Sequence, residues 1–263
     1  MKKRIVSIMG ACLLLFALSA PAQLSKRVSK KDAKKTMTWT TKSAPAKDLA
    51  SKGVDHFMNA EFEEGYNDLS AAIKLDPDFT VALLFMSNLA RGESSKAYAA
   101  RAIKSAANKT EGEKLFSSLA DEKGTQETRR DTWAKLHTMF PDGGMIGHYY
   151  AITRATPEER FTAAEDYIKQ FPDAPAMYNA LAYYYMQDKK DNTMAKKYFE
   201  KYIALYPDGA NPYDSMGEFY LDTGDSTNAE KYYKLALEKF PFLNSSINAL
   251  QKINDAKPKT DVK

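Results

Sequence analysis

The sequence predicts an all-α protein, built as a solenoid of about six stacked helix pairs with a single capping helix at the end. Apolar residues recur every three or four positions through most of residues 46–254, which places their side chains on one helical face. Short breaks divide this pattern into pairs of helices, and prolines close the pairs at a nearly constant interval. Such self-similarity is typical of solenoids, in which each unit packs on its neighbours.

The clearest pair lies at residues 210–241. Each of its two helices carries an apolar stripe: Tyr213, Met216, Gly217 and Tyr220, then Ala229, Tyr232, Tyr233, Ala236 and Leu237. Gly224 lies between the stripes, because glycine takes a positive φ without steric cost and readily ends a helix. Pro241 closes the second stripe, because proline cannot continue a helix. The small residues in the stripes let the two helix backbones approach each other closely.

Prolines mark the boundaries between pairs. They are Pro77, Pro141, Pro172, Pro207 and Pro241. Their spacings are 64, 31, 35 and 34 residues, and the first gap corresponds to two units with a boundary near Asn108–Lys109. Most of these prolines precede an aspartate, which supports a turn or caps the next helix. We therefore define units one to six as about 46–77, 80–109, 110–141, 144–172, 175–207 and 210–241.

Unit six resembles the tetratricopeptide repeat, a helix–turn–helix of about 34 residues with an ordered pattern of aromatic, Leu-Gly, Tyr, Ala, Phe, Ala and Pro positions. Unit five carries the same pattern at Tyr178, Leu181, Ala182, Tyr185, Ala195, Phe199 and Pro207. It has one extra residue in its turn, at Asp188–Asn192. Units one to four depart further, as at Gly65 and Arg129, where the family prefers alanine. The resemblance implies a right-handed α-α superhelix whose concave side is lined by the first helix of each pair.

Two helix termini have specific sequence signals. Thr156-Pro157-Glu158-Glu159 has the order of an N-cap, a first-turn proline and a capping-box glutamate, and it predicts the start of the second helix of unit four. Ile247, Leu250 and Ile253 recur at three-residue steps between polar residues, which predicts a capping helix with its apolar side toward unit six. We expect residues 255–263 to be a disordered tail.

The N-terminus has the features of a secretory signal peptide. Three basic residues precede an apolar run, and Ala20-Pro21-Ala22 supplies a small-x-small cleavage pattern. We expect residues 1–22 to be removed between Ala22 and Gln23, which places the protein in the periplasm or outside the cell. An uncleaved membrane anchor is the alternative, although the run falls short of the roughly 20 residues that span a bilayer. After cleavage no other segment could span a membrane, and Cys12, the only cysteine, would be lost.

Charge is distributed unevenly along the chain. Residues 23–45 are rich in lysine and carry a net charge of +6, and we expect them to form a disordered tail. Residues 46–254 hold 25 basic and 31 acidic residues, so the folded part is acidic although the whole chain has a net charge of +4. An acidic folded part argues against nucleic-acid binding. The basic tail could also fold back onto the acidic units.

No catalytic or metal-binding constellation is evident in the sequence. His56, His137 and His148 are the only histidines, and none stands in an H-E-x-x-H pattern. The Gly143–Gly147 segment is not a phosphate-binding loop, since no Lys-Ser/Thr follows it. The acidic turns lack the ligand spacing of an EF-hand. We therefore expect no enzyme activity, no cofactor and no metal.

The register of the repeat predicts a groove on the concave side. In tetratricopeptide proteins this surface holds an extended peptide or a partner helix. The residues placed there are His148 and Ile152 in unit four, Asn179, Tyr183 and Met186 in unit five, and Asn211, Asp214, Glu218 and Leu221 in unit six. Tyrosine and methionine provide adaptable apolar contacts, and asparagine can bond a peptide backbone. Family members that clamp a C-terminal carboxylate use basic groove residues, whereas Asp214 and Glu218 favour a basic or neutral ligand.

These features predict a non-catalytic scaffold that binds a protein or peptide partner on its concave face. The alternative is a carbohydrate- or small-ligand-binding protein that uses the tyrosine- and asparagine-rich units five and six, because aromatic rings can stack on sugars. An enzyme with a helical active site is a third and weaker hypothesis.

Overall fold

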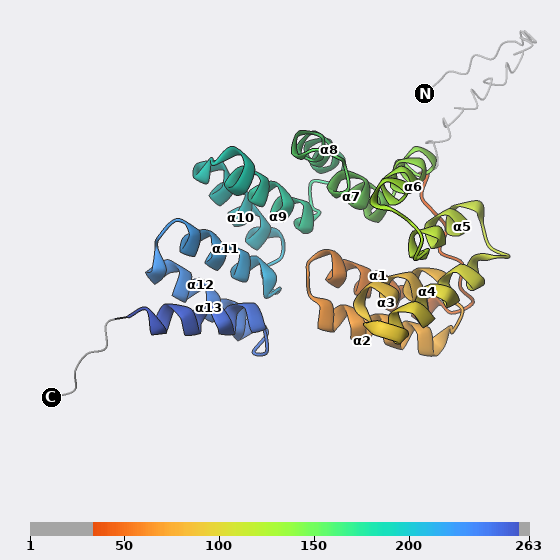
Figure 1. Cartoon of the computed structure of the whole chain (residues 1–263), viewed down its shortest axis with the longest axis horizontal. Helices are drawn as coiled ribbons and strands as arrows, with labels where there is room; N and C mark the ends of the chain where they lie inside the picture. Colours follow the sequence, from red (N-terminus) through yellow and green to blue (C-terminus); the bar gives the residue numbers. More distant parts are fainter. Residues whose placement is uncertain (1–33, 258–263) are drawn as a thin grey trace, which may run out of the picture. The chain divides into compact units, whose positions relative to one another are not determined.

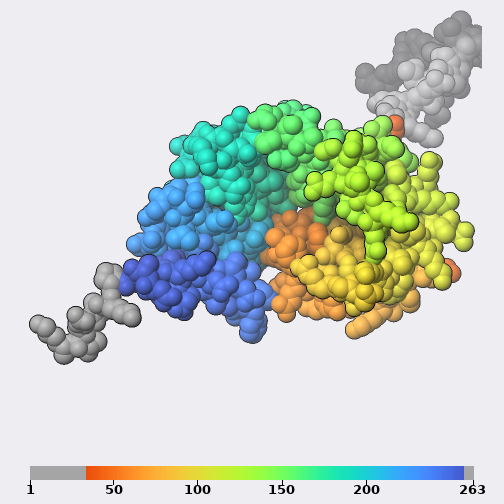
Figure 2. All heavy atoms as spheres, in the orientation of Figure 1, coloured from red at the N-terminus to blue at the C-terminus, as the bar shows by residue number. Residues whose placement is uncertain are grey.

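The computed structural model describes residues 34–257, which fold into thirteen α-helices with no β-strand among them (Figure 1). The first helices of the six pairs are α1 (Ala44–Met58), α3 (Thr80–Leu89), α5 (Glu111–Ser117), α7 (Gly144–Ile152), α9 (Pro175–Tyr184) and α11 (Asn211–Asp222). The second helices are α2 (Phe62–Leu75), α4 (Gly92–Ala106), α6 (Gln126–Met139), α8 (Pro157–Gln170), α10 (Asn192–Leu205) and α12 (Ser226–Lys239). Helix α13 (Asn244–Asp255) follows, and successive pairs touch in sequence order (Figure 2). The predicted fold class is confirmed.

Many of the helices begin at a short polar side chain that accepts a hydrogen bond from a free backbone N–H group. These N-caps are Ser43, Thr110, Thr125, Thr156, Asp191 and Asp225. At the start of α8, the Thr156 hydroxyl accepts from the Glu159 N–H, and the Glu159 carboxylate accepts from the Thr156 N–H. The capping box predicted from the sequence is therefore present.

The turns between units are built around the predicted prolines. Each of the five prolines lies two residues beyond the end of a second helix. In the C-terminal units, a tyrosine of the next first helix also fixes the turn. The Tyr178 hydroxyl donates to the Pro172 carbonyl at 2.9 Å, and the Tyr213 hydroxyl donates to the Pro207 carbonyl at 3.0 Å.

The extra residue in the turn of unit five is accommodated by a short π-helix. In unit six, the Asp225 N–H donates to the Tyr220 carbonyl at 2.8 Å and closes the turn. The corresponding bond of unit five joins the Asp191 N–H to the Tyr185 carbonyl at 2.9 Å and spans one residue more. The backbone between them, Tyr185–Lys189, is π-helical, and a π-helical turn is a common way to insert one residue into a helix.

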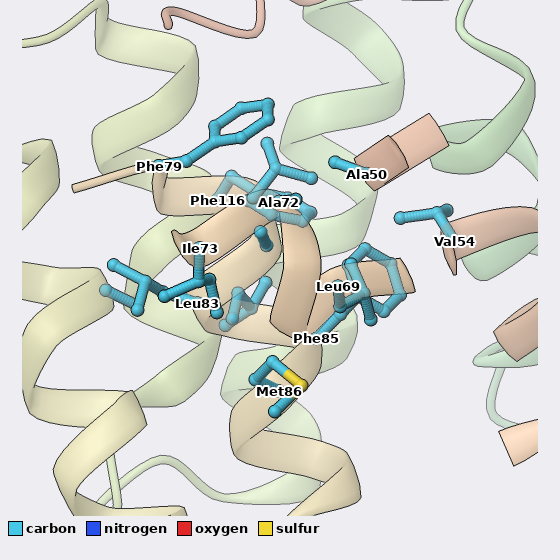
Figure 3. Close-up of a cluster of buried hydrophobic side chains, with 14 of the residues drawn as sticks. Ala50, Val54, Leu69, Ala72, Ile73, Phe79, Leu83, Phe85, Met86 and Phe116 are labelled. Atoms are coloured by element: carbon cyan, nitrogen blue, oxygen red, sulfur yellow. The ribbon is translucent and has the colours of Figure 1, made fainter. Parts of the chain in front are cut away.

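One apolar cluster runs from unit one to α7, with α3 at its centre (Figure 3). All residues at positions 80–87 of α3 are buried, whereas an ordinary amphipathic helix buries only one face. The Phe85 ring lies 5.2 Å from Phe57, 6.2 Å from Phe116 and 5.9 Å from Tyr149, measured between ring centroids. Four helices thus meet around one aromatic side chain.

The C-terminal units are held together by smaller clusters between neighbouring helices. The largest members of the cluster between units five and six are Met186, Phe199, Met216 and Phe219. Between α11 and α12, Gly217 allows the two helices to approach closely. A Cβ atom at Gly217 would lie 2.8 Å from the Tyr233 ring, so only glycine leaves room for this ring.

Residues 34–43 form an extended segment packed along units one to four, so the prediction of a disordered tail does not hold for them. The Thr40 N–H and hydroxyl donate to the Glu113 carboxylate at 2.8 and 2.6 Å. The Lys35 N–H donates to Asp142 at 2.8 Å, and Met37 is buried. The alternation Thr-Met-Thr-Trp-Thr directs apolar side chains inward, and it is hidden when only the lysine-rich composition is considered. The rest of the expected tail, residues 23–33, lies outside the described residues.

Helix α13 packs on α11 and α12 as the capping helix expected after unit six. Ile253 is buried and Leu250 is half-buried, but Ile247 is 41% exposed, so the predicted apolar side is only partly covered. Helix α13 ends at Asp255, and the expected C-terminal tail falls mostly on residues 258–263, outside the described residues. The expected signal peptide, residues 1–22, also lies outside them.

Candidate partner-binding site

Two of the predicted groove residues meet across neighbouring units. The Tyr183 hydroxyl of α9 donates to the Glu218 carboxylate of α11 at 2.7 Å. Each side chain projects from a first helix, and Pro175 and Pro212 lie in the first turns of these helices, where proline is well tolerated. The register assigned Tyr183 and Glu218 to one groove, and the structure shows the two side chains in contact across units five and six; their role in binding a partner stays a prediction.

The Tyr183 side chain is fixed both at its ring and at its hydroxyl. Its ring lies edge-on to Phe199 of α10, with 5.2 Å between the ring centroids. Burial of the phenol, followed by its contact with the Glu218 carboxylate, raises the pKa of Tyr183 above its ordinary value. The phenol therefore stays protonated and acts as a donor, while Glu218 remains exposed. This pair can present an acceptor carboxylate next to an aromatic ring.

A shallow groove of about 220 Å³ lies beside Tyr183, between the helices of units four and five. Ile152, a predicted groove residue at the end of α7, also lines it and is 37% exposed. The same groove includes Arg160 and Phe161 of α8 and Gln187 of the π-helix. The repeat register does not predict these three, because it assigns only first-helix residues to the groove. The stack of Phe161 on Tyr184, at 4.5 Å between centroids, forms the apolar wall of the groove.

Leu221 and Asn179 are two further predicted groove residues, and neither makes a contact with Tyr183 or Glu218 that is comparable to the bond between those two. Leu221 at the end of α11 is 37% exposed and is one of the larger exposed apolar side chains of the C-terminal units. Asn179 of α9 is half-buried, and its Oδ1 atom is enclosed with no hydrogen-bond partner in the described part of the protein. Neither residue contradicts the predicted groove.

Asp214 and Asn211 are already engaged within the protein. The Asp214 carboxylate accepts hydrogen bonds from Ser245 and Ser246 at the start of α13, so it ties the capping helix to α11. Burial raises the pKa of Asp214, and the two serine hydroxyls oppose that rise. The Asn211 amide donates to the Tyr202 hydroxyl at 3.1 Å. These two side chains serve the fold of units five and six.

The prediction that His148 lines an exposed groove is wrong. His148 is only 6% exposed and lies edge-on to Tyr149 and Tyr167. Burial lowers the pKa of its imidazole to about 4, so the ring is neutral at neutral pH. The physical reason is that residues of α1 face this side of α7, and His148 lies at the wall of a pocket that it shares with α1. The repeat register cannot reveal a contact with a helix of the first unit, which is distant in the sequence.

Met186 is also misplaced by the prediction. It is 4% exposed and belongs to the apolar cluster with Phe199 and Phe219. The register assumed a regular α-helix through this position, but the helix becomes π-helical at Tyr185. The smaller angular step of a π-turn redirects the side chains that follow, and Met186 turns into the core.

Two further observations concern metal binding and membrane-spanning helices. Within residues 34–257, no three side chains of His, Cys, Asp or Glu are arranged as a set that could hold a metal ion. None of the helices in the described part of the chain is both long and apolar enough to cross a membrane.

Comparison with known proteins places these units in a family. Residues 175–208 and 210–238 match the model described as tetratricopeptide repeat. No curated protein matches the chain. Among solved structures, the chain is similar to PilW, a widely conserved type IV pilus biogenesis factor, with 14% identity, 81% of this chain and 99% of that chain covered, and a TM-score of 0.48. It is also similar to a chain of the Cut9–Hcn1 hetero-tetramer of APC/C, with 12% identity and a TM-score of 0.49. That match covers 79% of this chain and 42% of the other chain.

A thermophilic protein of Thermus thermophilus with the same repeats is a further similar structure, with 14% identity, 80% of this chain and 98% of that chain covered, and a TM-score of 0.39. The two matched stretches coincide with units five and six, so these two units are tetratricopeptide repeats. The four preceding helix pairs continue the same architecture, and the chain as a whole is similar to tetratricopeptide repeat proteins.

Proposed function

We propose that the protein is a non-catalytic scaffold, exported to the periplasm or beyond, that binds a partner segment on the first helices of its C-terminal units. The tetratricopeptide fold is one that serves protein–protein interaction. The observation that carries the proposal is the contact between Tyr183 and Glu218, which joins two successive first helices at an exposed surface. The exposed side chains of Ile152 and Leu221 add apolar area to this surface.

The partner segment should be basic or neutral. Glu218 presents an exposed carboxylate, whereas Asp214 is already engaged by two serines. An acidic segment would be repelled by this carboxylate and by the net negative charge of residues 46–254. The Tyr183 ring and the groove beside it suit an apolar or amide side chain next to the basic one.

Export is proposed from the sequence of residues 1–22 alone. N-terminal sequencing of the protein purified from the envelope fraction of its own cells tests this part. A mature chain that begins at Gln23 is the expected result. A chain that retains Met1 in the cytoplasmic fraction would contradict export and leave the scaffold proposal intact.

The partner-binding surface is tested by a cross-linked pull-down from envelope extract, with Tyr183→Ala/Glu218→Lys beside the wild type. The control variant, Tyr66→Ala/Glu63→Lys, makes the same two changes at exposed positions of α2. Circular dichroism checks that both variants remain helical. We expect the wild type and the control to recover the same partner and the Tyr183/Glu218 variant to lose it.

Other outcomes separate the parts of the proposal. If all three proteins recover one partner, the scaffold function stands and this surface is the wrong one. If none of them recovers a partner under conditions where the fold is intact, the scaffold proposal itself is contradicted.

A further inference from the structure

A set of polar contacts joins unit one to the end of unit five and the start of unit six, which are far from it in the sequence. The Tyr206 hydroxyl, just after α10, donates to the Glu61 carboxylate at 2.5 Å. The Ala210 N–H donates to the other oxygen of the same carboxylate at 3.1 Å. His56 Nδ1 lies 2.8 Å from Glu61, in the turn between α1 and α2. The Glu61 side chain is only 9% exposed, so its carboxylate is largely shielded from water.

A second group of contacts lies beside the first. The Tyr202 hydroxyl donates to the Asn59 carbonyl at 3.4 Å, and the Asn211 amide donates to the Tyr202 hydroxyl at 3.1 Å. Both Asn59 and Tyr202 are buried. The turn between α1 and α2 is therefore held by both the end of α10 and the start of α11. In the space-filling view, the first unit (orange) lies against the chain of unit five, with an opening between unit one and the C-terminal helices (blue) (Figure 2).

The contact is polar, in contrast to the contacts between successive units. The apolar cluster that contains α1 and α2 reaches as far as Tyr149 of α7. The cluster that contains Phe199 of α10 and Met216 of α11 begins at Ala182. Neither cluster contains residues from the two sides of the contact. Separation would therefore leave both clusters intact and would expose mainly the buried Tyr202 side chain, which belongs to neither cluster.

Separation would also widen a pocket that is already partly open to solvent. His56 and Tyr206 belong to the wall of a cavity of about 510 Å³, which extends to Met145 and His148 of α7. With the contact in place, these two side chains form part of its boundary between α1 and the end of α10. Once the contact is broken, the pocket loses this part of its wall, and the side of α7 that faces α1 is more widely exposed.

We propose that residues 56–61 and 202–211 form a latch that closes the solenoid and can open without unfolding either end of the chain. The closed state is the structure described here. In the open state, the helices of units one to three and those of units five and six keep their own apolar clusters, and α7 between them becomes accessible. This inference does not depend on the identity of a partner, because opening can be measured on the protein alone.

The test compares Glu61→Ala/Tyr206→Phe with the wild type in the full-length mature protein. The matched control is Tyr213→Phe, which removes a hydroxyl that donates to the Pro207 carbonyl within the adjacent turn. Small-angle X-ray scattering measures the radius of gyration, and amide hydrogen exchange by NMR follows the Ala210 N–H. We expect the double variant to have a larger radius of gyration, Ala210 exchange at least tenfold faster, and unchanged helical circular dichroism. The control should match the wild type in all three measurements.

An unchanged radius of gyration together with unchanged Ala210 exchange in the double variant overturns the proposal. If the double variant loses helical signal, the single variant Glu61→Gln replaces it, because it keeps the side-chain shape but removes the charge and replaces one of the two accepting oxygens with an NH2 donor. Faster Ala210 exchange in a fully helical Glu61→Gln protein supports the latch. Exchange equal to the wild type in that variant overturns it.

Discussion

The two ends of the solenoid are built from the same helix pairs but are stabilised differently. Units one to three and α7 converge on one apolar cluster, in which α3 is enclosed and Phe85 contacts three other aromatic rings. Units five and six and α13 have separate clusters, each confined to neighbouring helices. The family model matches only the second region.

This difference explains why the repeat pattern weakens toward the N-terminus. In a nearest-neighbour solenoid, each position has the same environment in every unit, so the same residue types recur. In the N-terminal units, residues such as Phe85 face non-adjacent helices, and their size is selected by a single shared core. A departure from the repeat consensus therefore indicates a different packing arrangement, and the helix pairs themselves persist.

The largest expected effect comes from removing one aromatic ring in each region. Phe85→Ala and Phe199→Ala each delete a buried ring, and each should lower the free energy of unfolding by about 3–5 kcal/mol. The two variants should differ in how far the loss of amide protection extends from the substituted residue. Phe85→Ala should reduce amide protection through units one to three together, whereas Phe199→Ala should affect only α9 to α11.

Hydrogen exchange with mass spectrometry measures this spread, and urea unfolding measures the total loss. Equal and chain-wide loss of protection in both variants would contradict the distinction, because it would show one cooperative unit throughout. Loss of protection confined to the helices next to Phe85 would also contradict the distinction, because it would show that the N-terminal units do not share one core.

A pH-dependent effect is expected at α7, where the two regions meet. Burial lowers the pKa of His148 from 6.5 to about 4, so the unfolded chain binds a proton that the folded chain rejects. The stability contributed by the neutral imidazole is complete above pH 6.5 and is lost as the pH falls toward 4. Between pH 7 and pH 5 the free energy of unfolding should fall by about 2 kcal/mol from this group.

The measurement is urea unfolding of the wild type and His148→Gln at both pH values. A glutamine side chain cannot titrate, so the variant should lack this part of the pH dependence even if it is less stable at pH 7. An identical pH dependence in the two proteins would show that His148 is not the group responsible.

The sequence was sufficient for the helix pairs, because each is specified by signals within about 34 residues. The proline boundaries, the Thr156 capping box and the extra residue near Asp188 are signals of this kind. His148 and Met186 were misplaced, because their burial depends on contacts or backbone geometry outside the repeat pattern. His148 is covered by α1, and a π-turn rotates Met186 inward. For the candidate site, the register alone was enough to place Tyr183 and Glu218 near each other, while their role in binding stays a prediction.

A smaller effect should follow from adding one methyl group where helices approach closely. A Cβ at Gly217 would lie 2.8 Å from the Tyr233 ring, and one at Gly53 would lie 2.7 Å from Leu69. Either glycine-to-alanine change should cost about 1–3 kcal/mol through overpacking, despite the better helix propensity of alanine. Gly144→Ala is the control, because its nearest atoms would be 3.8 Å away.

Thermal and urea unfolding compare the three variants. Gly53→Ala should disturb the shared N-terminal cluster, and Gly217→Ala should disturb only α11 and α12. A Gly217→Ala protein as stable as Gly144→Ala would show that Tyr233 moves aside easily, and the close approach would then have no energetic importance.

The smallest expected effect concerns the turn bond that, within residues 34–257, is found in the C-terminal units. Tyr178 donates to the Pro172 carbonyl, whereas the corresponding residue of unit one is Leu49, which has no hydroxyl. Tyr178→Phe should therefore cost about 0.5–1.5 kcal/mol, toward the lower end because water can reach the exposed Pro172. Amide protection should fall only in α8, α9 and α10. A loss of protection that extended into units one to three would mean that this turn supports the N-terminal cluster as well. The C-terminal units would then not be stabilised by nearest neighbours alone, and the contrast between the two regions would have to be abandoned.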